Sequence, residues 1–167
     1  MRRAPSLVAV ALVVFHASLG HAQDAQTRAA RAFQEGEQAF AAGDYRRAAA
    51  AFEEANAIRP HGSALMNAAR ARQLAGDLAK AANEYARVAR DGATQRDRND
   101  AKDAIATLAA SVGRLAIQST CEASTISVDG QRAAEPELYV MPGEHVAECA
   151  IDGHPVRARA QVAAGDR

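Results

Sequence analysis

The stretch GDYRRAAAAFEEA at residues 43–55 returns 33 residues later as GDLAKAANEYARV at residues 76–88. In both copies Gly-Asp is followed by alanine, an aromatic residue and a small apolar residue at matching positions. Glycine takes the positive φ that ends a helix, and aspartate caps the N–H groups of the next helix. The repeat therefore predicts two helical hairpins, which must stack because one hairpin cannot bury its own apolar face. Stacked hairpins favour binding over catalysis.

Helical spacing of apolar residues extends on both sides of this repeat. We expect helices over about 25–42, 45–58, 63–75, 78–90 and 94–111, with Pro60 and Gly62 between the hairpins and Ser63 capping the third helix. The last helix carries one apolar stripe at positions i, i+3, i+4, i+7 and i+11, namely Ala101, Ala104, Ile105, Leu108 and Val112. With two repeats only, this fifth helix is predicted to cap the array.

Residues 29–93 resemble the tetratricopeptide repeat family, in which a helix hairpin recurs at about 34 residues. The first repeat carries the resemblance through Gly36, Ala48, Phe52, Ala55 and Pro60, in the order that the family shows. The resemblance implies a concave groove, lined by the first helix of each pair, that binds an extended peptide or a partner helix.

Six residues fall on groove positions when the resemblance is carried over: Phe33, Glu37, Phe40, Met66, Arg70 and Gln73. Apolar side chains at helical spacing are usually buried, so Phe33, Phe40 and Met66 suit the core as well. The lysines and asparagines with which one subfamily clamps a partner's terminal carboxylate are absent from these positions. A carboxylate-clamp adaptor is therefore disfavoured.

The N-terminus has the pattern of a cleavable secretory signal peptide. Arg2 and Arg3 precede an apolar run over 7–19, and small residues at Gly20 and Ala22 suit cleavage before Gln23. The alternative is a membrane anchor, but a run of 13 residues is shorter than the roughly 20 that span a bilayer. We expect an exported protein of the periplasm or cell envelope, with no stable membrane span after cleavage.

Charge excludes some partners. The chain holds 20 basic and 20 acidic residues, and loss of Arg2 and Arg3 with the signal peptide would leave a net charge of −2. Such a protein does not attract nucleic acid or an anionic membrane.

The pattern changes near Gly113, from helical spacing to alternation of Val, Ile and Thr with polar residues. Alternation predicts strands around 115–117, 126–128, 138–140, 145–151 and 156–162. Asp129-Gly130 and Asp152-Gly153 are signals of two-residue hairpin turns, and Pro142-Gly143 suits a type II turn. The predicted fold is α+β with two domains: a signal peptide at 1–22, a helical repeat domain at 23–112, and a small antiparallel, sandwich-like β module at 114–167.

Residues 114–165 resemble the short β modules named for a Pro-Glu-Gly-Ala motif. The resemblance is carried by Asp129-Gly130, by Met141-Pro142-Gly143-Glu144-His145 and by Gly153. The family usually continues one strand beyond the position of Arg167, so the resemblance leaves open whether the last sheet is complete. Such modules occur in envelope and surface proteins, which implies a second binding surface.

Both cysteines, Cys121 and Cys149, lie in the β module. In an exported protein they predict a disulfide, since their strands place both thiols on inward positions. A zinc site would recruit His145 and His154, but His145 and Cys149 would stand roughly 13 Å apart on one strand face. A redox role would call for Cys-x-x-Cys at a helix start, which is absent.

No sequence motif of a known catalytic class is present, and Glu53-Glu54 and Glu135/Glu137 are interpreted as solvated surface. We therefore expect a non-enzymatic scaffold or adaptor for protein partners, with no cofactor or metal. Two alternatives remain: a structural envelope component whose β module contacts cell-wall glycan, and an enzyme with a cleft of converging titratable groups.

Overall fold

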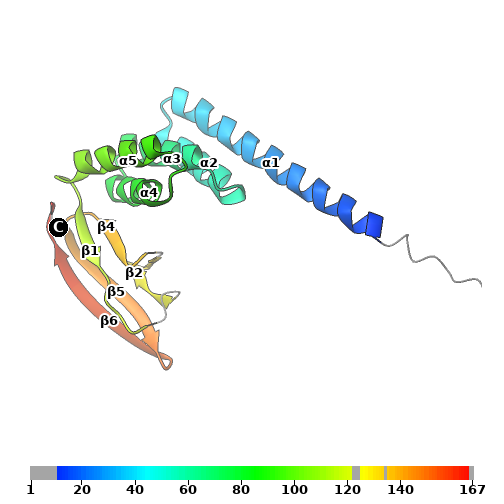
Figure 1. Cartoon of the computed structure of the whole chain (residues 1–167). Helices are drawn as coiled ribbons and strands as arrows, with labels where there is room; N and C mark the ends of the chain where they lie inside the picture. Colours follow the sequence, from blue (N-terminus) through cyan, green and yellow to red (C-terminus); the bar gives the residue numbers. More distant parts are fainter. Residues whose placement is uncertain (1–10, 122–124, 134, 166–167) are drawn as a thin grey trace, which may run out of the picture.

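The computed structural model describes residues 11–121, 125–133 and 135–165, with side chains from residue 23 onward. Helices come first and strands follow, so the predicted α+β layout is confirmed (Figure 1). The helices are α1 (Ala11–Ala41), α2 (Tyr45–Ile58), α3 (Gly62–Leu74), α4 (Leu78–Asp91) and α5 (Gln95–Leu108). The strands are β1 (Gly113–Ala116), β2 (Ser127–Val128), β3 (Gln131–Arg132), β4 (Glu137–Val140), β5 (Gly143–Ile151) and β6 (His154–Val162).

The two Gly-Asp pairs turn the chain as predicted. Gly43 and Gly76 have φ of 76° and 83°, which side chains with a Cβ rarely adopt. Asp44 accepts a hydrogen bond from the backbone N–H of Arg47 at 3.2 Å and so caps α2. Each pair therefore ends one helix and starts the next, but the expected cap is wrong for Asp77, whose side chain makes no capping hydrogen bond and pairs with Arg72 instead.

Two helix starts differ from the prediction. Helix α1 begins at Ala11, not near residue 25, and passes through Ala22 and Gln23 without a break. Helix α3 is capped by His61, whose ring Nδ1 accepts from the backbone N–H of Ser63, so the prediction of Ser63 as the cap is wrong. The imidazole ring precedes Gly62 and accepts from the N–H of Ser63 itself, whose hydroxyl lies 2.7 Å from the ring nitrogen.

Small residues let the helices approach closely. Ala48 and Ala81 are both 0% exposed, and a Cβ on Gly36 would stand 2.7 Å from the ring of Phe52. Phe52 is only 2% exposed and fills the space between α1 and α3. The core of the helical half is thus made largely of alanine around single larger side chains.

Helix α5 packs on α4. Its Ala101 and Leu108, with Val112 just after the helix, complete a second core cluster around Tyr85 and Val88. Its start carries a capping box, in which Thr94 and Asp97 exchange side-chain and backbone hydrogen bonds. The helix covers an apolar face that α3 and α4 would otherwise leave open, which is what a terminal cap of a helical array does.

Two antiparallel sheets form the β module. Strands β1 and β4 make a two-stranded sheet, and the other has the strand order β3-β2-β5-β6. The predicted hairpin turns are confirmed, since both residues of Asp129-Gly130 and of Asp152-Gly153 have positive φ. Gly143 instead has a φ of 147° and opens β5, so the type II turn expected there, with φ near about 80°, is wrong.

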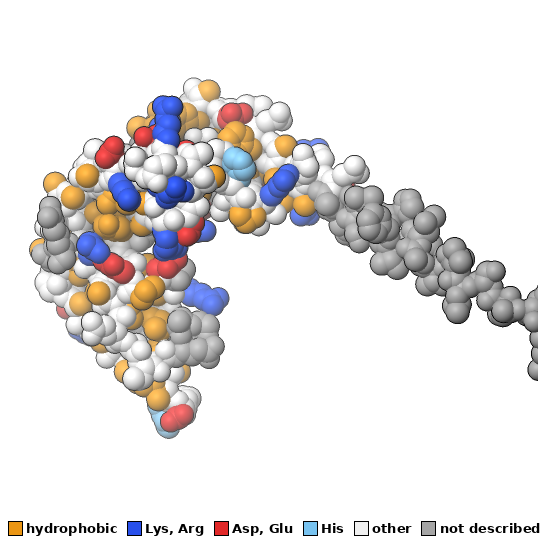
Figure 2. Space-filling model, in the orientation of Figure 1, with side chains coloured by type: hydrophobic (Ala, Val, Ile, Leu, Met, Phe, Trp, Pro, Cys, Tyr) orange, Lys and Arg blue, Asp and Glu red, His pale blue; other side chains and the backbone are white. Residues whose placement is uncertain are grey.

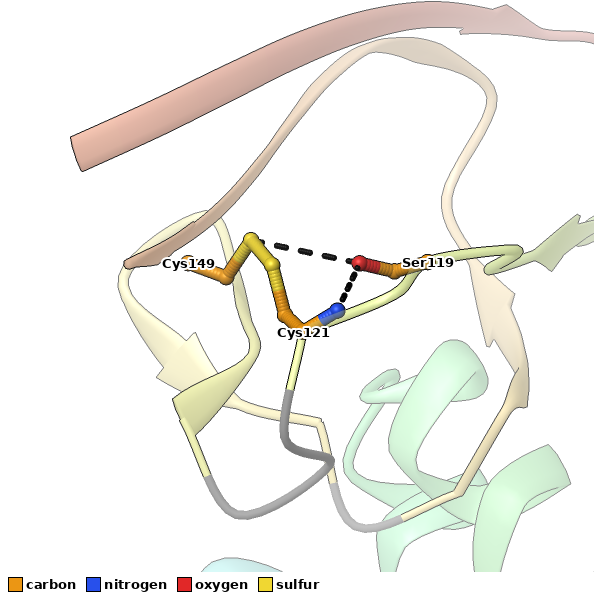
Figure 3. Close-up of a disulfide and its surroundings, with 3 residues drawn as sticks. All are labelled: Ser119, Cys121 and Cys149. Atoms are coloured by element: carbon orange, nitrogen blue, oxygen red, sulfur yellow. Dashed lines mark hydrogen bonds between the residues drawn. A yellow bond between two sulfur atoms is a disulfide. The ribbon is translucent and has the colours of Figure 1, made fainter. Parts of the chain in front are cut away.

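A disulfide ties the start of the module to β5. Cys121 and Cys149 are bonded, with Cα atoms 6.4 Å apart, as predicted (Figure 3). The Ser119 hydroxyl accepts from the backbone N–H of Cys121 at 3.0 Å and lies 4.0 Å from the Cys149 sulfur. The segment after β1 is thereby fixed to the long hairpin of β5 and β6. Disulfides of this kind persist in oxidising compartments.

Among the residues that the structure describes, no helix has the length and apolar character needed to cross a membrane.

Candidate functional site

The helical half and the β module are joined by specific hydrogen bonds. The side-chain amide of Asn83, on α4, donates to the carbonyl of Tyr139 and accepts from its N–H, each at 2.8 Å. Asn83 thus occupies the edge of β4 as a neighbouring strand would. A second link joins the ends of the two halves, where Gly165 N–H donates to the carbonyl of Val112 at 3.0 Å. Arg90 also pairs with Glu135 at 2.8 Å.

The joined halves enclose an open pocket. Figure 2 shows the molecule hollowed between the helices and the β module, with basic and acidic side chains around the hollow. The pocket has a volume of about 1090 Å³ and is lined by α2, the start of α3, α4 and strand β3. Its walls come from both halves, so its shape depends on the contact that Asn83 makes.

Helix α4 supplies one wall because its polar residues share a face. Lys80, Asn83, Glu84, Arg87 and Asp91 recur at three- and four-residue spacing and line the pocket. The opposite face of the same helix is buried in the core, through Ala81, Ala82 and Tyr85. The sequence of α4 therefore turns one charged stripe toward the β module.

Glu53, Arg72 and Glu84 meet in the pocket. Arg72 pairs with Glu53 at 2.6 Å and with Asp77 at 3.0 Å, while Glu84 Oε2 is buried and has no hydrogen-bond partner among the described residues. Burial, followed by the neighbouring Glu53, raises the pKa of Glu84 to about 8. Glu84 is therefore mostly protonated at neutral pH. Glu53, which was expected at a solvated surface, is instead half-buried in an ion pair.

Unlike Arg72, which forms two ion pairs, three other basic side chains of the pocket form none among the described residues. Lys80, Arg87 and Arg132 line it, yet none of the ion pairs between described residues includes any of them. Lys80 and Arg87 lie on α4, and Arg132 faces the pocket from β3. Their charges are available to a ligand.

A second, smaller cavity of about 240 Å³ lies inside the β module, between the β1 segment and the β5-β6 hairpin. Beside it His145, 9% exposed, contacts Asp129 Oδ2 and the carbonyl of Met141, both at 2.6 Å. Burial alone would lower the pKa of His145, but these two contacts outweigh it and raise the pKa above 6.5. The ring holds the Asp129-Gly130 turn against β5.

The six groove residues expected from the sequence lie outside the large pocket. Phe33 packs edge-on against Phe52, with ring centroids 5.2 Å apart, and Phe40 against Tyr45 at 5.3 Å. Met66 is half-buried against the second core cluster, and Gln73 accepts a hydrogen bond from the Tyr85 hydroxyl at 3.0 Å. Glu37 and Arg70 are exposed. The three apolar residues contribute to the core, and a partner-binding role for the set stays a prediction.

The pocket itself was not predicted. Its Glu84 and Asn83 sit inside the repeated stretch 76–88, where they look like ordinary polar residues of an exposed helix face. Glu84 becomes a buried acid because α2 and α3 bring Glu53 and Arg72 beside it, and Asn83 becomes a strand mimic because β4 lies beside α4. The one available signal was the unusually polar stripe at three- and four-residue spacing on α4.

Within the described part of the chain, no three residues among His, Cys, Asp and Glu are grouped so that they could hold a metal ion. His145 is occupied by Asp129 and Met141, and Cys149 by the disulfide. What the pocket offers chemically is a set of unpaired cations beside a neutral acid, which is suited to binding charged groups.

Comparison of the chain with protein-family models, with curated proteins and with solved structures finds no match.

Proposed function

We propose that this protein is a non-enzymatic scaffold or adaptor that binds protein partners in the periplasm or cell envelope. The observation that supports this most is the junction, in which Asn83 bonds to both the N–H and the carbonyl of Tyr139 beside a pocket lined by both halves. The tetratricopeptide-like groove would bind a peptide or helix, and the Pro-Glu-Gly-Ala-like module would add a second surface.

Export is the first part of the proposal. The disulfide between Cys121 and Cys149 favours an oxidising compartment, and residues 1–22 would act as a signal peptide cleaved between Ala22 and Gln23. The intact mass of protein from an envelope extract tests this. We expect the mass of a chain that begins at Gln23, and a soluble cytoplasmic product that retains residues 1–22 would contradict it.

Protein binding through α1 and α3 is the second part. Glu37 and Arg70 are exposed on these helices, beside the half-buried Phe33, Phe40 and Met66. A photo-crosslinking amino acid placed at Glu37 or Arg70 should capture a defined protein from the native envelope. The same amino acid at Lys102, which is exposed on α5, serves as the matched control.

The outcomes separate the proposal from its alternative. A protein captured from Glu37 and Arg70 but not from Lys102 supports the adaptor. If none is captured, and the mature protein instead sediments with purified peptidoglycan, the protein is a structural component that contacts cell-wall glycan.

A further inference from the structure

We propose that the pocket between α4 and β3 binds an acidic, extended segment of a partner protein. This inference rests on the proposed role as a protein-binding scaffold but concerns a different surface from the α1/α3 groove. It names the chemistry of the partner: carboxylate side chains on a chain without secondary structure of its own.

The first support is charge. Lys80, Arg87 and Arg132 stand around the pocket and belong to none of the ion pairs between described residues. Lys80 and Arg87 are seven residues apart on α4, which is about 10 Å along the helix axis. Carboxylates two to four residues apart on an extended chain are separated by roughly 7–13 Å. One short acidic segment can therefore reach both.

The second support is the state of the acids in the pocket. Glu53 is paired with Arg72, and Asp91 is paired with Arg90 at 3.1 Å. Glu84 holds its proton at neutral pH, because burial and Glu53 raise its pKa to about 8. Arg72 and Arg90 thus offset part of the negative charge that could repel an acidic ligand, whereas three basic groups are left without partners among the described residues.

The third support is an open strand edge. Strand β3 ends the order β3-β2-β5-β6, and Ala133 N–H donates to the Ile126 carbonyl at 2.9 Å. Because hydrogen-bonded residues alternate in an antiparallel pair, the N–H and C=O of Arg132 point away from β2. An extended chain can bond to them, as peptides do when they add to a sheet edge. The edge of β4, by contrast, is already closed by Asn83.

The same groups argue against a nucleic acid. The residues that line the pocket include no Phe, Tyr or Trp, which supply the main stacking surfaces for bases. The one imidazole among them, that of His61, is hydrogen-bonded to Ser63. Glu53 and Asp91 would also lie near any regular run of phosphates. Acidic side chains can be spaced to avoid these two carboxylates, whereas phosphates recur at a fixed interval.

The test uses the full mature chain and a fluorescein-labelled peptide of eight residues. Every second residue of the peptide is glutamate, and the others are serine or valine. Binding is followed by fluorescence anisotropy. We expect saturable binding that weakens as salt is raised, and much weaker binding of a peptide with glutamine in place of glutamate. Equal binding of both peptides, or no binding of the acidic one, would overturn the proposal.

Variants locate the site. Arg132→Glu should weaken binding roughly fivefold or more, and Lys80→Gln by about threefold, as expected for loss of solvent-exposed charge pairs. Lys102→Glu on α5 is the matched control and should leave the affinity unchanged. Melting curves of each variant check that folding is intact. Arg132→Gln gives a second measure that introduces no new repulsion.

Three further outcomes are decisive. A lysine-containing version of the peptide should bind Arg132→Glu better than it binds the parent protein. If a thymidine octanucleotide binds more tightly than the acidic peptide and loses affinity in the same variants, the pocket is a nucleic-acid site and the proposal fails. If Arg132→Glu leaves peptide binding unchanged while Glu37 still crosslinks to a protein, the pocket assignment fails alone and the scaffold function stands.

Discussion

The helical half and the β module are held together by different means. The helices pack through residues with almost no side chain, with Ala48, Ala49 and Ala68 all 0% exposed around Phe52. The β module buries few large side chains and relies on a disulfide and on the contacts of His145. One half is therefore sensitive to added volume and the other to the loss of single bonds.

This difference makes the two halves separable by experiment. A change that adds bulk should destabilise only the helices, and a change that removes a covalent or polar contact should destabilise only the β module. The junction at Asn83 decides how far a disturbance of one half reaches the other.

The largest effect is expected from loss of the disulfide. Cys121→Ser with Cys149→Ser should destabilise the β module by about 3.5 kcal/mol, because the bridge closes a loop across a separation of 28 residues. Helical circular dichroism should stay nearly unchanged while the strand signal melts earlier. Two titratable thiols in the native protein would show that the bridge does not form.

Ala48→Leu tests whether the helical half is sensitive to added side-chain volume. The added methyl groups have no room at a 0% exposed helix crossing, so the helical half should lose roughly 1–3 kcal/mol. Chemical denaturation followed by circular dichroism measures the loss. Ala50→Leu, on the exposed face of the same helix, is the control, and Glu37→Ala should also melt like the parent. An equal loss in all three would refute the tight crossing.

Asn83→Ala should uncouple the two halves. It leaves both the N–H and the carbonyl of Tyr139 without a partner, which costs about 1–2 kcal/mol in a partly buried setting. Hydrogen exchange of the Tyr139 amide should become faster while the cores exchange as before. Asn99→Ala, at an exposed position of α5, controls for loss of an asparagine. Unchanged exchange at Tyr139 would mean that the junction does not depend on this side chain.

The smallest effect concerns pH. The raised pKa of His145 means that its contribution to stability is present below about pH 6.5 and is lost as pH rises through the raised folded value. Asp129 has a lowered pKa, so its contribution is present above its ordinary value near 3.8 and is lost as pH falls through the folded value.

The β module should consequently be most stable between about pH 4 and 6.5, by less than about 1 kcal/mol because Asp129 is exposed. Thermal melts across this range measure the profile, and His145→Gln should flatten its decline above pH 6. A parent profile that rises with pH in that interval would contradict the charged pair.

Local sequence patterns predicted the helices, strands and turns well. They predicted the contacts between distant elements poorly. Gly43, Gly76, Asp129 and Asp152 mark turns that depend on neighbouring residues only, and all four were placed from the sequence. The start of α3 was predicted with the wrong cap, because His61 takes the N-cap position and its ring accepts from the N–H of Ser63. The prediction of a type II turn at Pro142-Gly143 was wrong because Gly143 is the first residue of β5.

The pocket could not be predicted because it depends on segments far apart in the chain. Asn83 and Tyr139 are 56 residues apart, and nothing in either local sequence signals the other. The prediction that Glu53 is a solvated surface residue failed for the same reason. Arg72 lies on another helix and pairs with Glu53 only once α2 and α3 are stacked. Phe33 and Met66 were placed on their helices from the apolar spacing, and they lie on α1 and α3. Their role in partner binding stays a prediction that the crosslinking experiment tests.

The buried Glu84 has a thermodynamic consequence for calorimetry. In the unfolded chain a glutamate is ionised at pH 7, with a pKa near about 4.3, whereas in the folded protein its pKa is about 8. Folding of the helical half therefore takes up close to one proton from the solvent, and unfolding releases it to the buffer. The apparent enthalpy of unfolding at neutral pH should then differ between phosphate and Tris by nearly the difference of their ionisation enthalpies.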